Sequence, residues 1–135
     1  MKKYLTPTRI VALIALCLLA IVVTRCLPGE RGLAGVYVIQ NHSHTSDTLW
    51  LEPNNKYRRV LRNISDNSII LTESDTWEFE GGKLVLKNYS VDSDRIGVNY
   101  SAGGYDYAHL EVSRKGGEYK IYVNIDLGYY YLRIN

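Results

Sequence analysis

The chain has 135 residues, 46% of them hydrophobic and 22% charged, with 16 Lys and Arg against 14 Asp and Glu. Three of the basic residues lie in the first nine positions, so the rest of the sequence carries 13 basic and 14 acidic side chains. This near-neutral balance does not fit the concentrated positive charge of a nucleic-acid-binding protein. About 100 residues follow the N-terminal segment, which is enough for one domain and too few for two.

The N-terminal segment predicts a membrane helix. Residues 10–23 carry no charged side chain, and a run of this length suits a signal-peptide core better than a full span of about 20 residues. Val22 and Thr24, however, make a poor cleavage site, which normally has small residues at both positions. The apolar segment can also be extended at both ends, because Arg9 and Arg25 can reach the membrane surface. The sequence therefore favours an uncleaved signal anchor at residues 10–27, with a cleaved signal as the alternative.

The flanking charges predict the orientation of this helix. Lys2, Lys3 and Arg9 precede the apolar segment, whereas Arg25 and Arg31 follow it. The positive-inside rule makes residues 1–9 a cytoplasmic n-region and exports the C-terminal domain. The Met-Lys-Lys start resembles a bacterial leader, so we expect a single-pass protein of the bacterial inner membrane with its domain in the periplasm. Signal cleavage would instead give a periplasmic or secreted protein.

The two cysteines lie in or beside the apolar segment. On one helix Cys17 and Cys26 would be about 13 Å apart, which is too far for a disulfide bond. Acylation of Cys26 stays open, because cysteines beside a membrane span can be lipidated. The exported domain is expected to fold without a disulfide and to depend on its hydrophobic core.

After a linker at residues 28–33, residues 34–135 show only strand patterns. Short alternating runs are separated by turns such as Gly81-Gly82 and Gly116-Gly117, at roughly the 8–12-residue spacing of barrels and sandwiches. The pattern predicts an all-β domain, a single antiparallel meander barrel or half-barrel of eight to nine strands. The expected strands include separate runs at Ile69–Leu71, Trp77–Phe79 and Ile96–Tyr100.

Alternation also assigns the faces of the last strands. We expect Leu110, Ile121, Tyr130, Leu132 and Ile134 to face the core, which leaves an aromatic and polar opposite face. The chain contains 12 Tyr against one Phe and two Trp, and tyrosine is enriched at contact surfaces, although half-buried strands also favour it. The predicted partner-binding residues on this face are Tyr107, His109, Tyr122, Tyr129, Tyr131 and Arg133.

Five motifs follow one another along residues 34–90. They are Gly35-Val-Tyr37, Asp47-Thr-Leu-Trp-Leu51, Asn55-Lys-Tyr57-Arg58, Thr76-Trp77-Glu-Phe79 and Leu84-Val-Leu86-Lys-Asn-Tyr89. This succession resembles the small lipocalin-like meander domains of uncharacterised bacterial envelope proteins and lipoproteins. The resemblance implies an antiparallel barrel or half-barrel and brings no catalytic residues with it.

The motifs that could carry chemistry are incomplete. His42-Ser-His44 and Asp47 offer part of a zinc ligand set that would need a further residue such as His109. Asp92-Ser-Asp94 lacks the glycine and the final glutamate of a calcium-binding loop. No G-x-S-x-G motif presents a nucleophilic serine. We therefore predict no catalytic residue, no metal site and no cofactor.

Together these features predict a membrane-tethered periplasmic binding or interaction module without catalytic activity. An inhibitor or immunity-type protein that masks a protein partner in the envelope belongs to this class. The alternative, which follows from the lipocalin-like resemblance, is a carrier of a small apolar ligand inside the barrel. The predicted inward residues Trp77, Phe79 and Tyr119 are large, which favours a filled core and therefore the first function.

Overall fold

The computed structural model describes residues 30–97, 100 and 104–134. In these residues no helix is long and apolar enough to cross a membrane. The predicted n-region (1–9) and signal anchor (10–27) lie outside the described part of the chain. The elements are α2 (Glu30–Leu33), β1 (Gly35–Gln40), β2 (Thr45–Leu51), β3 (Lys56–Asn63), β4 (Ile69–Glu80), β5 (Lys83–Tyr89), β6 (Tyr105–Lys115), β7 (Glu118–Asn124) and β8 (Tyr129–Arg133).

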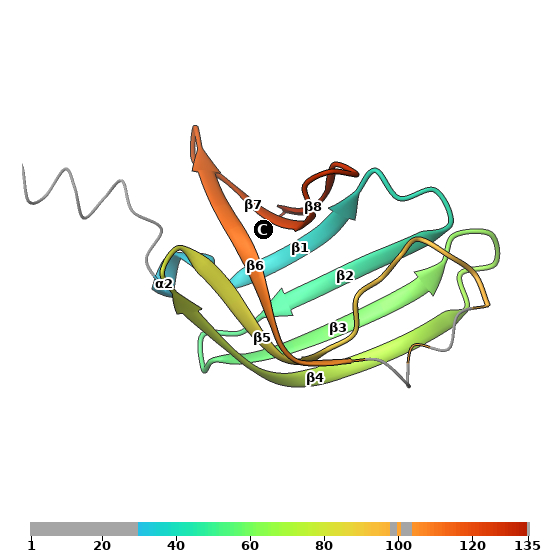
Figure 1. Ribbon diagram of the computed structural model, residues 1–135, viewed down its shortest axis with the longest axis horizontal. Helices are drawn as coiled ribbons and strands as arrows, with labels where there is room; N and C mark the ends of the chain where they lie inside the picture. The colour runs from blue at the N-terminus through green and yellow to red at the C-terminus, as the bar shows by residue number, and fades with distance from the viewer. Residues whose placement is uncertain (1–29, 98–99, 101–103, 135) are drawn as a thin grey trace, which may run out of the picture.

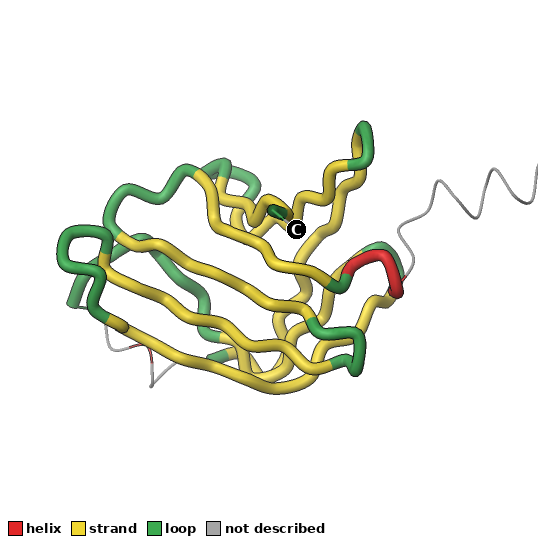
Figure 2. The backbone as a smooth tube through the Cα atoms, turned by 180° about the vertical axis from the view of Figure 1, so that it is seen from behind, coloured by secondary structure: helices red, strands yellow, loops and turns green. Residues whose placement is uncertain are grey.

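The strands form one closed antiparallel barrel (Figure 1). Each strand pairs with the next along the chain, and β8 pairs with β1 to close the sheet. Closure removes the unpaired edges that an open sheet of this size would expose. The view from behind shows that nearly all the described backbone is strand and connecting loop (Figure 2). The predicted all-β meander is confirmed, and its architecture is compatible with a lipocalin-like barrel.

Two of the predicted strands differ from the structure. Strand β4 is one strand of 12 residues, not separate runs at 69–71 and 77–79. Its middle, Thr72–Thr76, is polar and gives no apolar alternation, but its backbone pairs with β3 throughout. The strand expected at 96–100 is not seen in the described part of that segment, where Ile96 and Gly97 form a turn.

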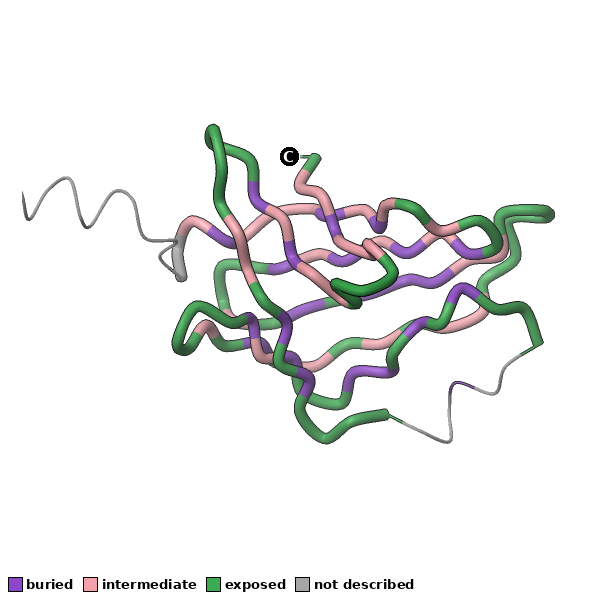
Figure 3. The backbone as a smooth tube through the Cα atoms, turned by 45° about the horizontal axis from the view of Figure 1, so that its top comes forward, coloured by how far each residue is buried: buried purple, intermediate pink, exposed green. Residues whose placement is uncertain are grey.

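The core lies inside the barrel and contains most of the residues predicted for it. Trp77 is 1% exposed, and its Nε1 donates a hydrogen bond of 3.0 Å to the Glu52 carbonyl. Buried and less buried residues alternate along the strands, as a barrel with one inner face requires (Figure 3). The hydrophobic core comprises Leu33, Tyr37, Ile39, Leu49, Leu51, Tyr57, Trp77, Leu84, Leu86, Tyr89, Ala108, Leu110, Tyr119, Ile121 and Tyr131.

Strand β8 faces the opposite way from the prediction. Tyr131 is fully buried opposite Ile121, whereas Tyr130 and Leu132 lie half-buried on the outside and Ile134 is 54% exposed. The sequence alternates large residues on both faces of β8, so apolar content alone could not choose between them. The choice follows from the Tyr131 hydroxyl, which finds hydrogen-bond partners inside the barrel.

A second change of alternation occurs at the end of β5. Leu84 and Leu86 face the core, and simple alternation would place Asn88 inside. Asn88 instead has a φ of 51°, is exposed, and is followed by the buried Tyr89. Asparagine is one of the few non-glycine residues that adopts this left-handed conformation readily. The Tyr89 side chain therefore enters the barrel beside Tyr131.

Candidate functional site

The centre of the barrel holds a charged cluster, which we call the interior polar cluster (Asp47, Arg59, Glu73, Tyr89 and Tyr131). Arg59 on β3 is 0% exposed. Its Nε lies 3.0 and 2.9 Å from the two Asp47 carboxylate oxygens, and its Nη2 lies 2.7 Å from Oδ2. Its Nη1 donates to Glu73 Oε2 at 2.9 Å and to the Ser90 carbonyl. Every nitrogen of the guanidinium group therefore has an acceptor, which a buried charge requires.

The two tyrosines complete this cluster. The Tyr131 hydroxyl donates to Asp47 Oδ2 at 2.5 Å and lies 3.1 Å from the Tyr89 hydroxyl. The Arg59 guanidinium carbon lies 4.3 Å from the centre of the Tyr89 ring. Burial raises the pKa of both tyrosines, so both hydroxyls remain protonated hydrogen-bond donors at neutral pH. The cluster therefore fills part of the barrel interior with polar groups that are hydrogen-bonded to one another.

A second cluster, the rim cluster (His42, Thr45, Asp92, Asp94 and Tyr100), ties the loop after β1 to the segment after β5. Asp94 accepts hydrogen bonds of 2.8, 2.8 and 2.9 Å from the backbone amides of residues 43, 44 and 45. Asp92 accepts from the Thr45 hydroxyl at 2.6 Å and from the Tyr100 hydroxyl at 2.8 Å. Although burial favours the neutral acid, hydrogen bonds from His42, Thr45 and Tyr100 lower the Asp92 pKa to about 2.

His42 is the most unusual residue of the rim cluster. Its side chain is 2% exposed, and Nδ1 lies 3.1 Å from Asp92 Oδ2 and 3.0 Å from Thr45 Oγ1. The ring also contacts the Tyr129 ring edge-on, with 4.4 Å between centroids. Its Nε2 is buried and has no hydrogen-bond partner among the described residues. Such an orphaned nitrogen is rare inside proteins and requires an explanation.

An open cleft of about 620 Å³ lies over this cluster. Its lining comes from His44, from residues 93–96, and from Leu127 and Tyr129 at the β7–β8 turn. The cleft is at the end of β1 that is remote from α2, because its lining comes from the segments that follow β1, β5 and β7. Among the described residues no group of three His, Cys, Asp or Glu side chains could hold a metal ion. The partial zinc ligand set noted in the sequence is separated in the structure, since His42 pairs with Asp92 and Asp47 lies in the interior polar cluster.

The outside of the barrel carries a third feature, the outer aromatic strip. The Tyr122 and Tyr130 rings on β7 and β8 have centroids 5.9 Å apart, and Lys120 Nζ lies 4.8 Å from the Tyr130 ring centre. Pairing of β1 with β8 and β2 continues the strip across the barrel surface. It ends at the Trp50 ring, which the Arg58 guanidinium covers at 4.0 Å. The strip comprises Val36, Val38, Trp50, Arg58, Lys120, Tyr122, Tyr130 and Leu132.

The structure divides the predicted partner-binding residues into three groups. Tyr107 and His109 are exposed on the outside of β6, opposite Lys87 and Val85 of β5, and Tyr122 lies on the outside of β7. Tyr129, Tyr131 and Arg133 belong to the inward face of β8, which corrects the prediction that they share the outer face with Tyr122. Tyr129 packs against His42, Tyr131 is in the interior polar cluster, and Arg133 Nη1 donates to the Gly32 carbonyl at 2.8 Å.

Sequence reasoning missed the interior polar cluster, although one signal was present. Alternation through Leu49 and Leu51 places Asp47 on the inner face of β2, and alternation through Tyr57 places Arg59 on the inner face of β3. Two opposite charges predicted inside one barrel indicate an ion pair, because an unpaired buried charge is very unfavourable. Tyr130 was missed as an outer residue because β8 was assigned the wrong face.

Comparisons with family models, with curated proteins and with solved structures each found no significant match to this chain.

Proposed function

We propose that this chain is a membrane-tethered binding module of the bacterial periplasm, without catalytic activity, which holds a protein partner against the outer aromatic strip. An inhibitor or immunity-type protein would work in this way, by covering a surface of its partner. The sequence of residues 1–27 supports the tether and the export. The outer aromatic strip supports the proposal that the partner is bound on the outside of the barrel.

The single observation that carries the proposal is the composition of the outer aromatic strip. Tyr, Trp and Arg are the residue types most enriched at binding hot spots. Here Trp50 under Arg58 and Tyr122 beside Tyr130 are held on β2, β3, β7 and β8, which with β1 form one run of neighbouring strands in a closed barrel. A rigid scaffold lowers the entropic cost of ordering these side chains on binding.

The interior of the barrel argues against the alternative, a carrier of a small apolar ligand. Arg59, Asp47 and Glu73 place a guanidinium and two carboxyl groups in its interior, where Arg59 is hydrogen-bonded to both carboxyl groups. An apolar ligand there would have to displace these bonds and leave charges without partners, which costs several kcal/mol or more. Binding on the outside leaves the interior polar cluster intact.

The proposal is tested with full-length tagged protein, extracted from its own membranes in mild detergent together with whatever binds it. The double variant Tyr122→Ser/Tyr130→Ser should fold normally and lose a specific partner that the wild-type protein retains in stoichiometric amount. Tyr105→Ser/Tyr107→Ser is the matched control, because these tyrosines are exposed on β6 outside the strip. This control should retain the partner. Equal retention by both double variants would rule out the strip as the contact surface.

A further inference from the structure

The cleft at the barrel end is a second feature, separate from the outer aromatic strip. It opens where three segments meet, and a hydrogen bond of 2.8 Å from Asn41 Nδ2 to the Gly128 carbonyl joins two of them. Two apolar side chains on its walls, Ile96 and Leu127, are 56% and 60% exposed. Exposed apolar residues beside convergent polar groups are typical of a small-molecule site.

The rim cluster determines that the Nδ1 atom of His42 carries a proton. The Thr45 hydroxyl donates its hydrogen to Asp92 Oδ2, so both neighbours of His42 Nδ1 offer it only lone pairs. The hydrogen-bond network therefore assigns a proton to Nδ1. In the neutral ring, Nε2 is then a hydrogen-bond acceptor that has no donor among the described residues. His42 does not itself line the cleft, but the Tyr129 ring that packs against it does.

The cleft also offers both kinds of hydrogen-bonding group. Asp94 Oδ2 accepts one hydrogen bond, from the Ser43 amide, whereas Oδ1 accepts two, from the amides of residues 44 and 45, so Oδ2 retains acceptor capacity. Arg95 is exposed on the same wall and makes no ion pair within the described residues, so its guanidinium is available as a donor. One carboxylate and one guanidinium give no net formal charge, which favours a neutral ligand over an ion.

We propose that this cleft binds a saccharide. A sugar ring has an apolar face that can pack on Tyr129 and Leu127, and it has hydroxyl groups that both donate and accept hydrogen bonds. Its hydroxyls donate to Asp94 Oδ2 and accept from Arg95. In the bound state Tyr129 exchanges its contact with His42 for the sugar ring, and a further hydroxyl donates to His42 Nε2. The site therefore supplies the donor that this nitrogen lacks.

The test uses full-length protein in detergent micelles, labelled with ¹⁵N at histidine, and two probes, N,N′-diacetylchitobiose and maltose. We expect at least one disaccharide to shift the His42 Nε2 resonance in a saturable way, because that nitrogen gains a hydrogen-bond donor. Tyr129→Leu should weaken this binding about tenfold, whereas Tyr129→Phe retains the ring and should bind within about twofold of wild type. Arg95→Gln should weaken binding, and Lys115→Gln, at the end of β6, is the matched control that should not.

Two results would overturn the proposal. One is the absence of any saturable shift at His42 with either disaccharide in protein whose thermal unfolding is normal. The other is a response to n-butylammonium but to neither sugar, which would assign the cleft to a cation. Binding that survives Tyr129→Leu unchanged would place the sugar elsewhere on the barrel and would contradict the proposal equally.

Discussion

At the scale of single residues, Tyr130 and Tyr131 show how one strand divides its side chains between two roles. They are neighbours in sequence, but Tyr131 is fully buried in the interior polar cluster and Tyr130 belongs to the outer aromatic strip. Their hydroxyls differ accordingly. Of the two, Tyr131 alone donates a hydrogen bond to a buried carboxylate, that of Asp47. This carboxylate also forms an ion pair with Arg59.

This difference predicts opposite outcomes for two chemically identical changes. Tyr131→Phe should lower the free energy of unfolding by about 1–3 kcal/mol, because Asp47 Oδ2 and the Tyr89 hydroxyl each lose a buried partner. Tyr130→Phe should change it by less than about 0.5 kcal/mol. Urea unfolding of the two variants gives the comparison. Equal losses would show that the face assignment of β8 is wrong.

The residues also show what the sequence could and could not predict. Trp77, Leu110 and Ile121 were placed correctly in the core, because each lies in a short run in which inward and outward residues alternate. Tyr131 was misplaced, because a tyrosine is compatible with either face until the partners of its hydroxyl are known. Those partners come from strands that are 42 and 84 residues away in sequence, which no local pattern reports.

At the scale of the elements, the end of β5 depends on one backbone conformation. Asn88, with its φ of 51°, turns Tyr89 into the barrel. Asn88→Gly should be tolerated, whereas Asn88→Val should be less stable than the glycine variant by about 1–2 kcal/mol, since a β-branched residue strongly disfavours the left-handed region. Thermal unfolding measures the difference. Equal stability of the two variants would mean that β5 ends without this turn.

The rim cluster, which joins the loop after β1 to the segment after β5, should stabilise the fold less at low pH. The Asp92 pKa is about 2 in the folded protein, below its usual value of 3.8, so the ionised form is favoured by folding. Its contribution, about 1–2 kcal/mol after solvent screening, is present above about pH 4 and is lost as the pH falls through about 2.

The variant Asp92→Asn checks this contribution. This variant should have a lower free energy of unfolding than wild type at neutral pH. The difference between the two proteins should become smaller as the pH is lowered. Unfolding free energies of the two proteins across this pH range supply the measurement. A gap that stays constant down to the lowest pH would contradict a role for the Asp92 charge.

At the scale of the whole molecule, the tether is expected to place the barrel at a membrane. If residues 10–27 form an uncleaved anchor, the protein should stay in the membrane fraction after carbonate and high-salt washes, with the mass of the full 135-residue chain. A soluble periplasmic species that lacks about the first two dozen residues would show instead that the segment is a cleaved signal.

The overall architecture was largely predictable, because eight strands that are joined mostly by short turns and have one apolar face can pack in few ways other than a barrel or a sandwich. Closure between β1 and β8 was not, since it depends on pairing between the two ends of the domain. The binding surfaces were harder to predict from the sequence than the fold. The outer aromatic strip collects residues from β1, β2, β3, β7 and β8, and its two ends become neighbours only when the barrel closes.

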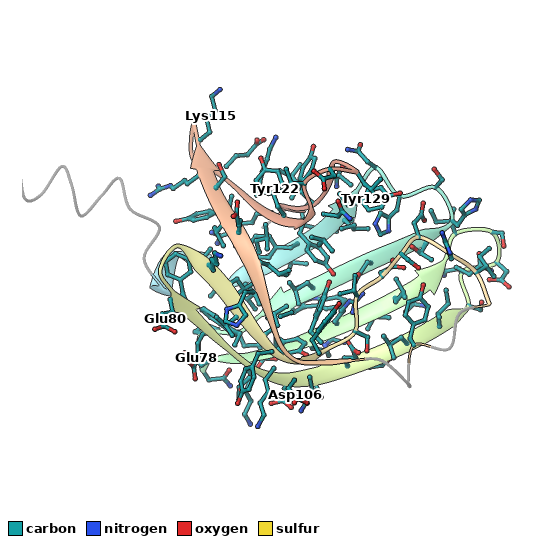
Figure 4. The ribbon with its side chains drawn as sticks, in the orientation of Figure 1. Glu78, Glu80, Asp106, Lys115, Tyr122 and Tyr129 are labelled. Atoms are coloured by element: carbon teal, nitrogen blue, oxygen red, sulfur yellow. The ribbon has the colours of Figure 1, made fainter. Side chains whose placement is uncertain are left out.

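The central claim is that a partner is held on the outer aromatic strip, and photo-crosslinking tests it most directly. A photoreactive phenylalanine analogue is placed at position 122 or 130 of the full-length protein in living cells, and in parallel at position 78 or 80 on β4. Tyr122 and Glu78 lie on well-separated parts of the barrel (Figure 4). We predict one discrete protein adduct from positions 122 and 130 and none from 78 and 80. Adducts from the β4 positions alone, or none from any of the four, would contradict the account.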